Sequence, residues 1–137
     1  MKIKIIDVVL WVLQVLLAVA FLAHGLMFLN PPAEYVSLMD ASMARSLRYF
    51  IGVMEVAAAV GLTLPGLTRI MPFLVGWAAA GIMIVMVSAT VFHAARGEYG
   101  SAVTTFILLL LATFVAWMRV RVRPIAARRR MVSAPAI

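Results

Sequence analysis

Hydrophobic and polar positions divide the chain into four long apolar stretches separated by short polar breaks. The stretches are centred near Leu16, Glu55, Met83 and Leu109. Each is about as long as the roughly 20 residues needed to cross the hydrocarbon of a bilayer. Because the backbone polar groups of a spanning segment must find partners within it, all four are predicted to be helices. A transmembrane barrel would need strict alternation, which runs such as ILLLLA lack.

The polar breaks set the bounds of these helices. The Asn-Pro-Pro at residues 30–32 ends the first helix and Pro65-Gly66 ends the second, because proline cannot continue the hydrogen-bond ladder. Pro72 falls in the first turn of the third helix, where proline is tolerated. The helices are therefore expected at about 5–29, 44–64, 69–95 and 101–118.

The segment between the first two spans, PPAEYVSLMDAS, supports two interpretations. It could form a short interfacial helix with Asn30 as N-cap and Pro31 in its first turn, since Tyr35, Leu38 and Met39 share a helical face. It could equally form an ordered loop.

Composition agrees with a membrane protein: 66% of the residues are hydrophobic and only 12% are charged. The expected fold is all-α, an integral membrane four-helix bundle of one domain over residues 1–118 followed by a basic tail over 119–137. The chain has no cysteine, which excludes disulfides, thiolate metal sites and a thiol relay.

The basic residues predict the orientation of the bundle. Nine of the twelve Lys and Arg residues lie on the side of the two termini, against Arg45, Arg48 and Arg96 on the other. The positive-inside rule therefore predicts that both termini lie in the cytoplasm. The tail carries most of the +7 net charge. We interpret it as a topology anchor that touches anionic lipid, and we expect no nucleic-acid binding because no folded basic domain or aromatic platform accompanies it.

Glu55 is the most informative polar residue, because an acid at mid-bilayer is costly and marks a functional site by default. Arg48 lies on the same helix face, about 10 Å nearer the outer surface, and Gly52 between them leaves room. His24 and His93 lie in the outer halves of their helices. These residues are therefore expected to line one outward-opening cavity.

Such a cavity suits an amphipathic small molecule such as a quinone, whose carbonyls accept hydrogen bonds from histidine or arginine. Aromatic and methionine neighbours for its ring are available in Tyr49, Phe50, Met54 and Met27. The candidate ligand-binding residues are Glu55, His24, Arg48, Gly52, Tyr49 and His93, with no catalytic residue assigned. A proton path through Glu55 is a second interpretation. A metal site ranks last, because the histidines lack metal-ligand spacing.

Purely structural roles stand beside these functional ones. Glu55 could be protonated, or paired with Arg48 or a threonine hydroxyl, and join helices by bonds worth about 0.5 to 2 kcal/mol. His24 and His93 could simply be hydrated at the outer interface. Asp7 and Gln14 are expected to be interfacial or packing residues.

Several small-residue and turn motifs resemble the DoxX family, specifically its short DoxX-like branch. They are Ala23-His24-Gly25, the G-x-x-E from Gly52 to Glu55, Leu64-Pro65, Leu67-Thr68-Arg69 with Pro72, and His93 before Arg96-Gly97-Glu98. The resemblance implies a four-helix bacterial inner-membrane bundle associated with quinone-linked oxidation of reduced sulfur, terminal oxidases or redox-stress complexes. Glu55 matches the acid of the second helix. The chain departs from the pattern near Met27, where a lysine is expected, and His24 is a candidate replacement as the basic partner of Glu55.

Together these observations predict an accessory redox subunit, rather than a stand-alone enzyme, that binds a quinone or similar molecule in an outward-facing polar pocket. One alternative is a non-enzymatic scaffold or assembly partner of a larger complex. A second is a small proton path or transporter, which would need a dimer. The expected partners are membrane lipid and either further copies of the chain or other subunits of a membrane complex.

Overall fold

The computed structural model describes residues 4–128, and this part of the chain is built from helices. In order they are α1 (Ile5–Leu29), α2 (Ala33–Ser42), α3 (Arg45–Thr68), α4 (Leu74–Ala95), α5 (Tyr99–Trp117) and the π-helical turn η1 (Met118–Val122). Four segments are long and apolar enough to cross a membrane: α1, α3, α4, and α5 together with η1. The prediction of an all-α bundle with four spanning helices is confirmed.

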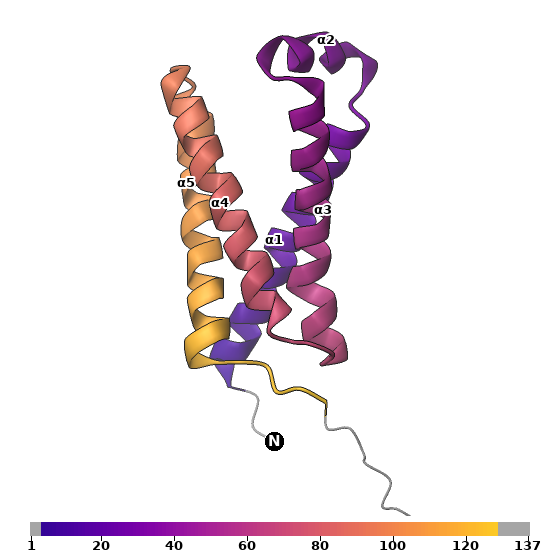
Figure 1. The fold of residues 1–137 in the computed structure, drawn as a ribbon. Helices are drawn as coiled ribbons and strands as arrows, with labels where there is room; N and C mark the ends of the chain where they lie inside the picture. The colour runs from indigo at the N-terminus through magenta and orange to yellow at the C-terminus, as the bar shows by residue number, and fades with distance from the viewer. Residues whose placement is uncertain (1–3, 129–137) are drawn as a thin grey trace, which may run out of the picture.

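The four long helices form two antiparallel pairs, α1 with α3 and α4 with α5, and the pairs meet mainly where α3 packs against α4. Figure 1 shows that the pairs lie close together at the end that holds both ends of the described chain, and that they diverge toward the end capped by α2. We call these the terminal end and the α2 end. Both ends of the described chain, residues 4 and 128, therefore lie on one side of the bundle.

The core consists of apolar side chains from all four long helices. It includes Leu17, Phe21, Leu62, Ile82 and Val115, each almost fully buried. Large apolar side chains also cover the outward-facing surface of every span. Soluble proteins rarely expose so large an apolar surface to water. The outward faces are therefore suited to contact lipid, as in a multi-pass membrane protein.

Helices α1 and α3 cross closely because glycine lies on both sides of the crossing. A Cβ atom added at Gly25 would lie 2.8 Å from the Gly52 carbonyl oxygen, and one added at Gly52 would lie 3.0 Å from the Gly25 carbonyl oxygen. Small residues of this kind let helix backbones approach in membranes. This crossing sets the spacing of the side chains just above and below it.

The predicted end of the second span was wrong. Helix α3 continues through Pro65 to Thr68 and ends where Arg69 adopts the left-handed conformation, with φ of 57°. Proline removes only its own N–H from the ladder, and spanning helices tolerate this because neighbouring groups compensate. The Thr68 hydroxyl donates to the Leu64 carbonyl oxygen at 2.8 Å and so supports the last turn.

The next helix starts later than predicted. Residues 69–73 form a turn in which Arg69 and Met71 both have positive φ, and α4 begins at Leu74. Pro72 therefore precedes the helix instead of lying in its first turn.

The segment after the first span does form a short helix, α2, but Asn30 does not cap it. Asn30 ends α1, where its N–H donates to the Leu26 carbonyl oxygen, and α2 starts after Pro32. Helix α2 buries none of its residues, so it lies on the surface of the α2 end.

The start of the expected tail packs against the bundle. Arg119 is buried in η1, and the Arg128 N–H donates to the Arg69 carbonyl oxygen at 3.0 Å. The segment that joins them therefore runs across the terminal end from α5 to the end of α3 (Figure 1). Arg129 and Arg130 lie outside the described residues. The division into domain and tail stays a prediction, but Arg119 itself belongs to the packed bundle.

Candidate functional site

A cleft of about 1320 Å³ lies between the two helix pairs toward the α2 end. Helices α1 and α3 line one side, α4 and α5 line the other, and the second half of α2 borders it. His24, Arg48, Glu55 and His93 are all among its lining residues. The structure thus brings four of the six candidate residues to one cleft.

Glu55 and His24 form a direct pair at the α1–α3 side of this cleft. His24 Nδ1 lies 2.6 Å from Glu55 Oε2, and the Phe28 ring packs beside the imidazole with centroids 4.3 Å apart. The side chain of Glu55 is only 2% exposed, whereas that of His24 is 45% exposed. A buried carboxylate is therefore linked to the cleft through a half-exposed imidazole.

The Gly25–Gly52 crossing explains why this pair forms. His24 directly precedes Gly25 on α1, and Glu55 lies one helical turn beyond Gly52 on α3, so the close approach of the backbones brings their side chains together. The partner of Glu55 is thus neither Arg48 nor a threonine hydroxyl. Its partner in the structure is His24.

Arg48 is held by α2 and the end of α1. Its guanidinium donates to Asp40 Oδ1 at 3.3 Å and to the Phe28 carbonyl oxygen at 3.4 Å, and it lies 5.4 Å from the centroid of the Tyr49 ring. Asp40 also accepts a bond of 2.6 Å from Arg45. The Arg45 guanidinium, followed by Arg48, keeps the pKa of the Asp40 carboxyl below its usual value. Sequence reasoning missed Asp40, because no motif marks it.

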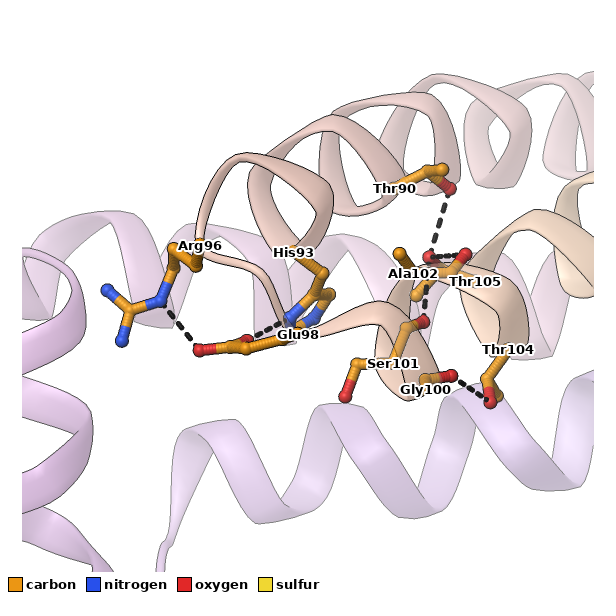
Figure 2. A network of polar contacts seen from close by, with 9 residues as sticks. All are labelled: Thr90, His93, Arg96, Glu98, Gly100, Ser101, Ala102, Thr104 and Thr105. Atoms are coloured by element: carbon orange, nitrogen blue, oxygen red, sulfur yellow. Dashed lines mark hydrogen bonds and ion pairs between the residues drawn. The ribbon is translucent and has the colours of Figure 1, made fainter.

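His93 belongs to a second histidine–carboxylate pair on the opposite side of the cleft. Figure 2 shows its ring directed at Glu98, with Nδ1 2.5 Å from Oε2, while Arg96 Nε donates to Glu98 Oε1 at 2.7 Å. These bonds, that of Arg96 first, lower the pKa of the Glu98 carboxyl. Farther from the turn along the two helices, the hydroxyls of Thr90 and Thr105 lie 2.9 Å apart and join α4 to α5 (Figure 2).

Gly52 and Tyr49 are not brought to the cleft. Gly52 packs against the α1 backbone, and Tyr49 is half-exposed beside Arg48. Of the proposed ring neighbours, Phe50 lines the cleft and Met27 does not. Met54 instead lines a smaller cavity of about 350 Å³ between α3 and α4, which also reaches Glu55.

A separate polar cluster joins the spans nearer the terminal end. Gln14 is fully buried, donates from Nε2 to the Leu62 carbonyl oxygen at 2.7 Å, and accepts a 2.6 Å bond from Arg119 Nε. Asp7 lies 3.6 Å from Arg119 and 3.8 Å from Arg123. More than a hundred residues separate Gln14 from Arg119, so the sequence contains no signal for this contact. The cluster has no lining residue in the cleft and holds α1 to α3 and η1.

The histidines do not combine into a metal centre. Each bonds to a different carboxylate, and residues 4–128 contain no group of three or more His, Asp or Glu side chains placed to hold a metal ion.

Comparison with known proteins places the chain in a family. The model of the DoxX-like family matches residues 12–115, a range that includes both histidine–carboxylate pairs. The curated proteins and the solved structures compared with the chain show no match. Because the family model covers about three quarters of the sequence, the chain belongs to the DoxX-like family.

Proposed function

We propose that this protein binds a quinone or similar amphipathic small molecule in the cleft and acts as an accessory redox subunit of a bacterial inner membrane. The observation that carries the proposal is the Glu55–His24 pair, in which a buried carboxylate bonds to an imidazole that is half-exposed on the cleft. Ionisable residues inside spanning segments occur mainly where they act on ligands, ions or protons.

The distribution of side chains along the cleft supports an amphipathic ligand. Apolar side chains such as Phe21, Phe50 and Leu108 line much of it and suit a ring and a hydrocarbon tail. Polar side chains, among them Arg48 and His93, gather toward the α2 end and suit a headgroup. Ligand sites in proteins typically combine an apolar lining with a few polar groups in this way.

The charge distribution supports the location. Both ends of the described chain lie at the terminal end. Six of the nine described Lys and Arg residues lie in the segments at that end, namely Lys4, Arg69, Arg119, Arg121, Arg123 and Arg128. With that end in the cytoplasm, the cleft opens toward the outer leaflet. A quinone dissolved in the bilayer could enter there, and this agrees with the redox associations that the family resemblance implies.

The proposal is tested by ligand binding in lipid nanodiscs. We expect saturable binding of a short-tailed quinone by quenching of protein fluorescence, and at least tenfold weaker binding by the His24→Ala and Glu55→Gln variants. Tyr49→Phe, a change on the same helix but outside the cleft, is the matched control and should bind as wild type. Equal binding by all four proteins, or no saturable binding, would contradict the proposal.

The same preparation distinguishes the proposed ligand-binding role from the scaffold alternative. A partner protein that co-purifies from native membranes with both wild type and Glu55→Gln, in the absence of quinone binding, would favour a scaffold.

A further inference from the structure

The smaller cavity, of about 350 Å³ between α3 and α4, adjoins the cleft but has a different character. Phe21, Glu55, Ile82 and Val85 line both spaces, so the two meet at these side chains. The histidines and arginines of the cleft are not among the described residues that line the smaller space. We call it the α3–α4 cavity.

Small residues on the two helices explain why this space exists. A Cβ atom added at Gly61 of α3 would lie 2.8 Å from the Cβ atom of Ala78 on α4, so the helices touch there. A Cβ atom added at Gly81, about one turn farther toward the α2 end, would have nothing within 4 Å. Because α3 and α4 diverge in that direction (Figure 1), the absent side chain of Gly81 leaves a space that no neighbour fills.

The α3–α4 cavity opens sideways, on the surface that is suited to contact lipid. Three of its lining residues are exposed, namely Met54, Ala57 and Trp77. Met54 and Ala57 lie near the middle of the 24 residues of α3, which is the depth of the hydrocarbon in a spanning helix. A molecule therefore enters this cavity from the bilayer, whereas the cleft opens toward the α2 end.

Glu55 is the only ionisable side chain among the described residues that line the α3–α4 cavity. Its 2.6 Å contact with His24 uses Oε2 alone. The other oxygen, Oε1, has no hydrogen-bond partner among residues 4–128 and is not fully buried. The remaining lining is apolar, apart from the indole N–H of Trp77. The cavity thus combines an apolar wall with one free carboxyl oxygen.

These properties define the chemistry of a ligand. An apolar protein cavity of about 150 Å³ stays dry and holds a benzene ring, so a cavity of about 350 Å³ has room for a ring and a short chain. A molecule that arrives through hydrocarbon must be uncharged, because a charge is costly there. A hydroxyl group both donates and accepts hydrogen bonds, so it can pair with Oε1 of an ionised or a protonated carboxyl.

We infer that the α3–α4 cavity is a second binding site, which takes from the bilayer a small uncharged molecule with an apolar ring and one hydroxyl group. The ring fills the space beside Gly81, and the hydroxyl bonds to Oε1 of Glu55. This site differs from the proposed quinone site in its walls, its entrance and the oxygen of Glu55 that it uses.

The inference is tested by photolabelling in lipid nanodiscs with a small alcohol that carries a diazirine, followed by mass spectrometry of the labelled residues. We expect saturable labelling of the α3–α4 lining. A short-chain alkylphenol and the alkylbenzene with the same chain serve as competitors at equal mole fraction in the lipid. The alkylphenol should compete roughly fivefold more strongly, because it makes one hydrogen bond that the alkylbenzene lacks.

Two glycine variants provide the site-directed arm of the test. Gly81→Leu places a side chain in the empty space and should abolish the saturable labelling. Gly100→Leu is the matched control, because a Cβ atom there also has nothing within 4 Å, but Gly100 lines the cleft instead, so labelling of the α3–α4 lining should be as in wild type. The two competitors are compared on wild type, so that arm is decisive even if Gly81→Leu does not fold.

Three results would overturn the inference. Unsaturable labelling spread over the outward faces of the spans would show partitioning into lipid only. Labelling of a folded Gly81→Leu variant as in wild type would place the bound alcohol elsewhere, and equal competition by the two competitors would exclude the bond to Glu55. Gly81 does not line the cleft, so Gly81→Leu should bind quinone as wild type does. A failure of quinone binding would therefore contradict the proposed function alone.

Discussion

At the scale of single residues, the buried charged residues Glu55 and Arg119 have different surroundings. Glu55 has His24 as its partner, and that partner is half-exposed on the cleft. Arg119 bonds to the fully buried Gln14 and lies beside Asp7. A buried charge is costly unless it is paired and hydrogen-bonded. Both have a partner, although Arg119 Nη2 is buried without one among the described residues. Only the partner of Glu55 is exposed on the cleft, so we assign Arg119 to stability.

The role of Arg119 can be measured directly. Arg119→Met keeps most of the side-chain volume but removes the bond to Gln14 and leaves Gln14 Oε1 buried without its donor. The free energy of unfolding should fall by about 1–3 kcal/mol, measured by thermal or denaturant unfolding in detergent. Arg121→Met, at an exposed position two residues on, should change it by less than about 0.5 kcal/mol. Equal stability of the two variants would rule out this role.

At the scale of elements, the close crossing of α1 and α3 connects packing to the site. The crossing depends on the absence of side chains at Gly25 and Gly52, and the His24–Glu55 pair lies within one helical turn of it. Packing of this kind is disrupted by even one added methyl group when the neighbour is backbone.

The crossing predicts that Gly25→Ala is destabilising. The new Cβ would meet the Gly52 carbonyl oxygen at 2.8 Å, so the helices must separate, and stability should fall by about 1–3 kcal/mol. Gly81→Ala is the matched control, because nothing lies within 4 Å of a Cβ there. Alanine favours a helix over glycine, so unfolding of this control should be unchanged or slightly harder. A stable Gly25→Ala protein would show that the helices are not in close contact.

The α4–α5 turn predicts a local response to acid. Arg96 and His93 hold the pKa of Glu98 below its ordinary value of 4.5. Their bonds therefore stabilise the turn above about pH 4.5, and this stabilisation is lost as the pH falls through the pKa of the folded state. Hydrogen exchange over residues 96–102, corrected for the intrinsic rate, should show extra opening on acidification in wild type. The Glu98→Gln variant has no carboxyl group to titrate at this position, so its protection should be the same before and after acidification.

At the scale of the whole molecule, the two helix pairs and the side on which the chain ends lie determine where the cleft opens. The pairs meet through α3 and α4 and diverge toward α2 (Figure 1). The cleft thus lies at the end of the bundle opposite the ends of the described chain. The positive-inside rule predicts that this end faces the outside of the cell.

This orientation is testable in a chain without cysteine. Single cysteines at Ser37, exposed on α2, and at Ala126, exposed at the terminal end, should react differently with a membrane-impermeant maleimide applied to intact cells. Ser37→Cys should be labelled, and Ala126→Cys should be labelled only after permeabilisation. The opposite pattern would invert the topology and direct the cleft to the cytoplasm.

The sequence was sufficient for the features that depend on local pattern. Apolar runs of spanning length predicted four helices, because lipid leaves the backbone no other partners. It was less reliable at helix ends, as at Pro65, where the helix continues to Thr68 because proline removes only its own N–H from the ladder. Depth along the helices also placed His24, Arg48, Glu55 and His93 in one half of the bundle, and all four are lining residues of the cleft, while their role in ligand binding stays a prediction.

Only the tertiary structure decided which of these residues bond to each other. Depth is a one-dimensional property, whereas pairing depends on the rotation of each helix and on how closely two helices approach. The Gly25–Gly52 crossing brings His24 into contact with Glu55. The position of α2 brings Asp40 within hydrogen-bond distance of Arg48. Likewise Gln14 and Arg119, far apart in sequence, meet because α5 packs against α1 and η1 continues from α5. The sequence by itself therefore determined the spans and the depth of the polar groups, and the folded bundle determined their partners and the shape of the cleft.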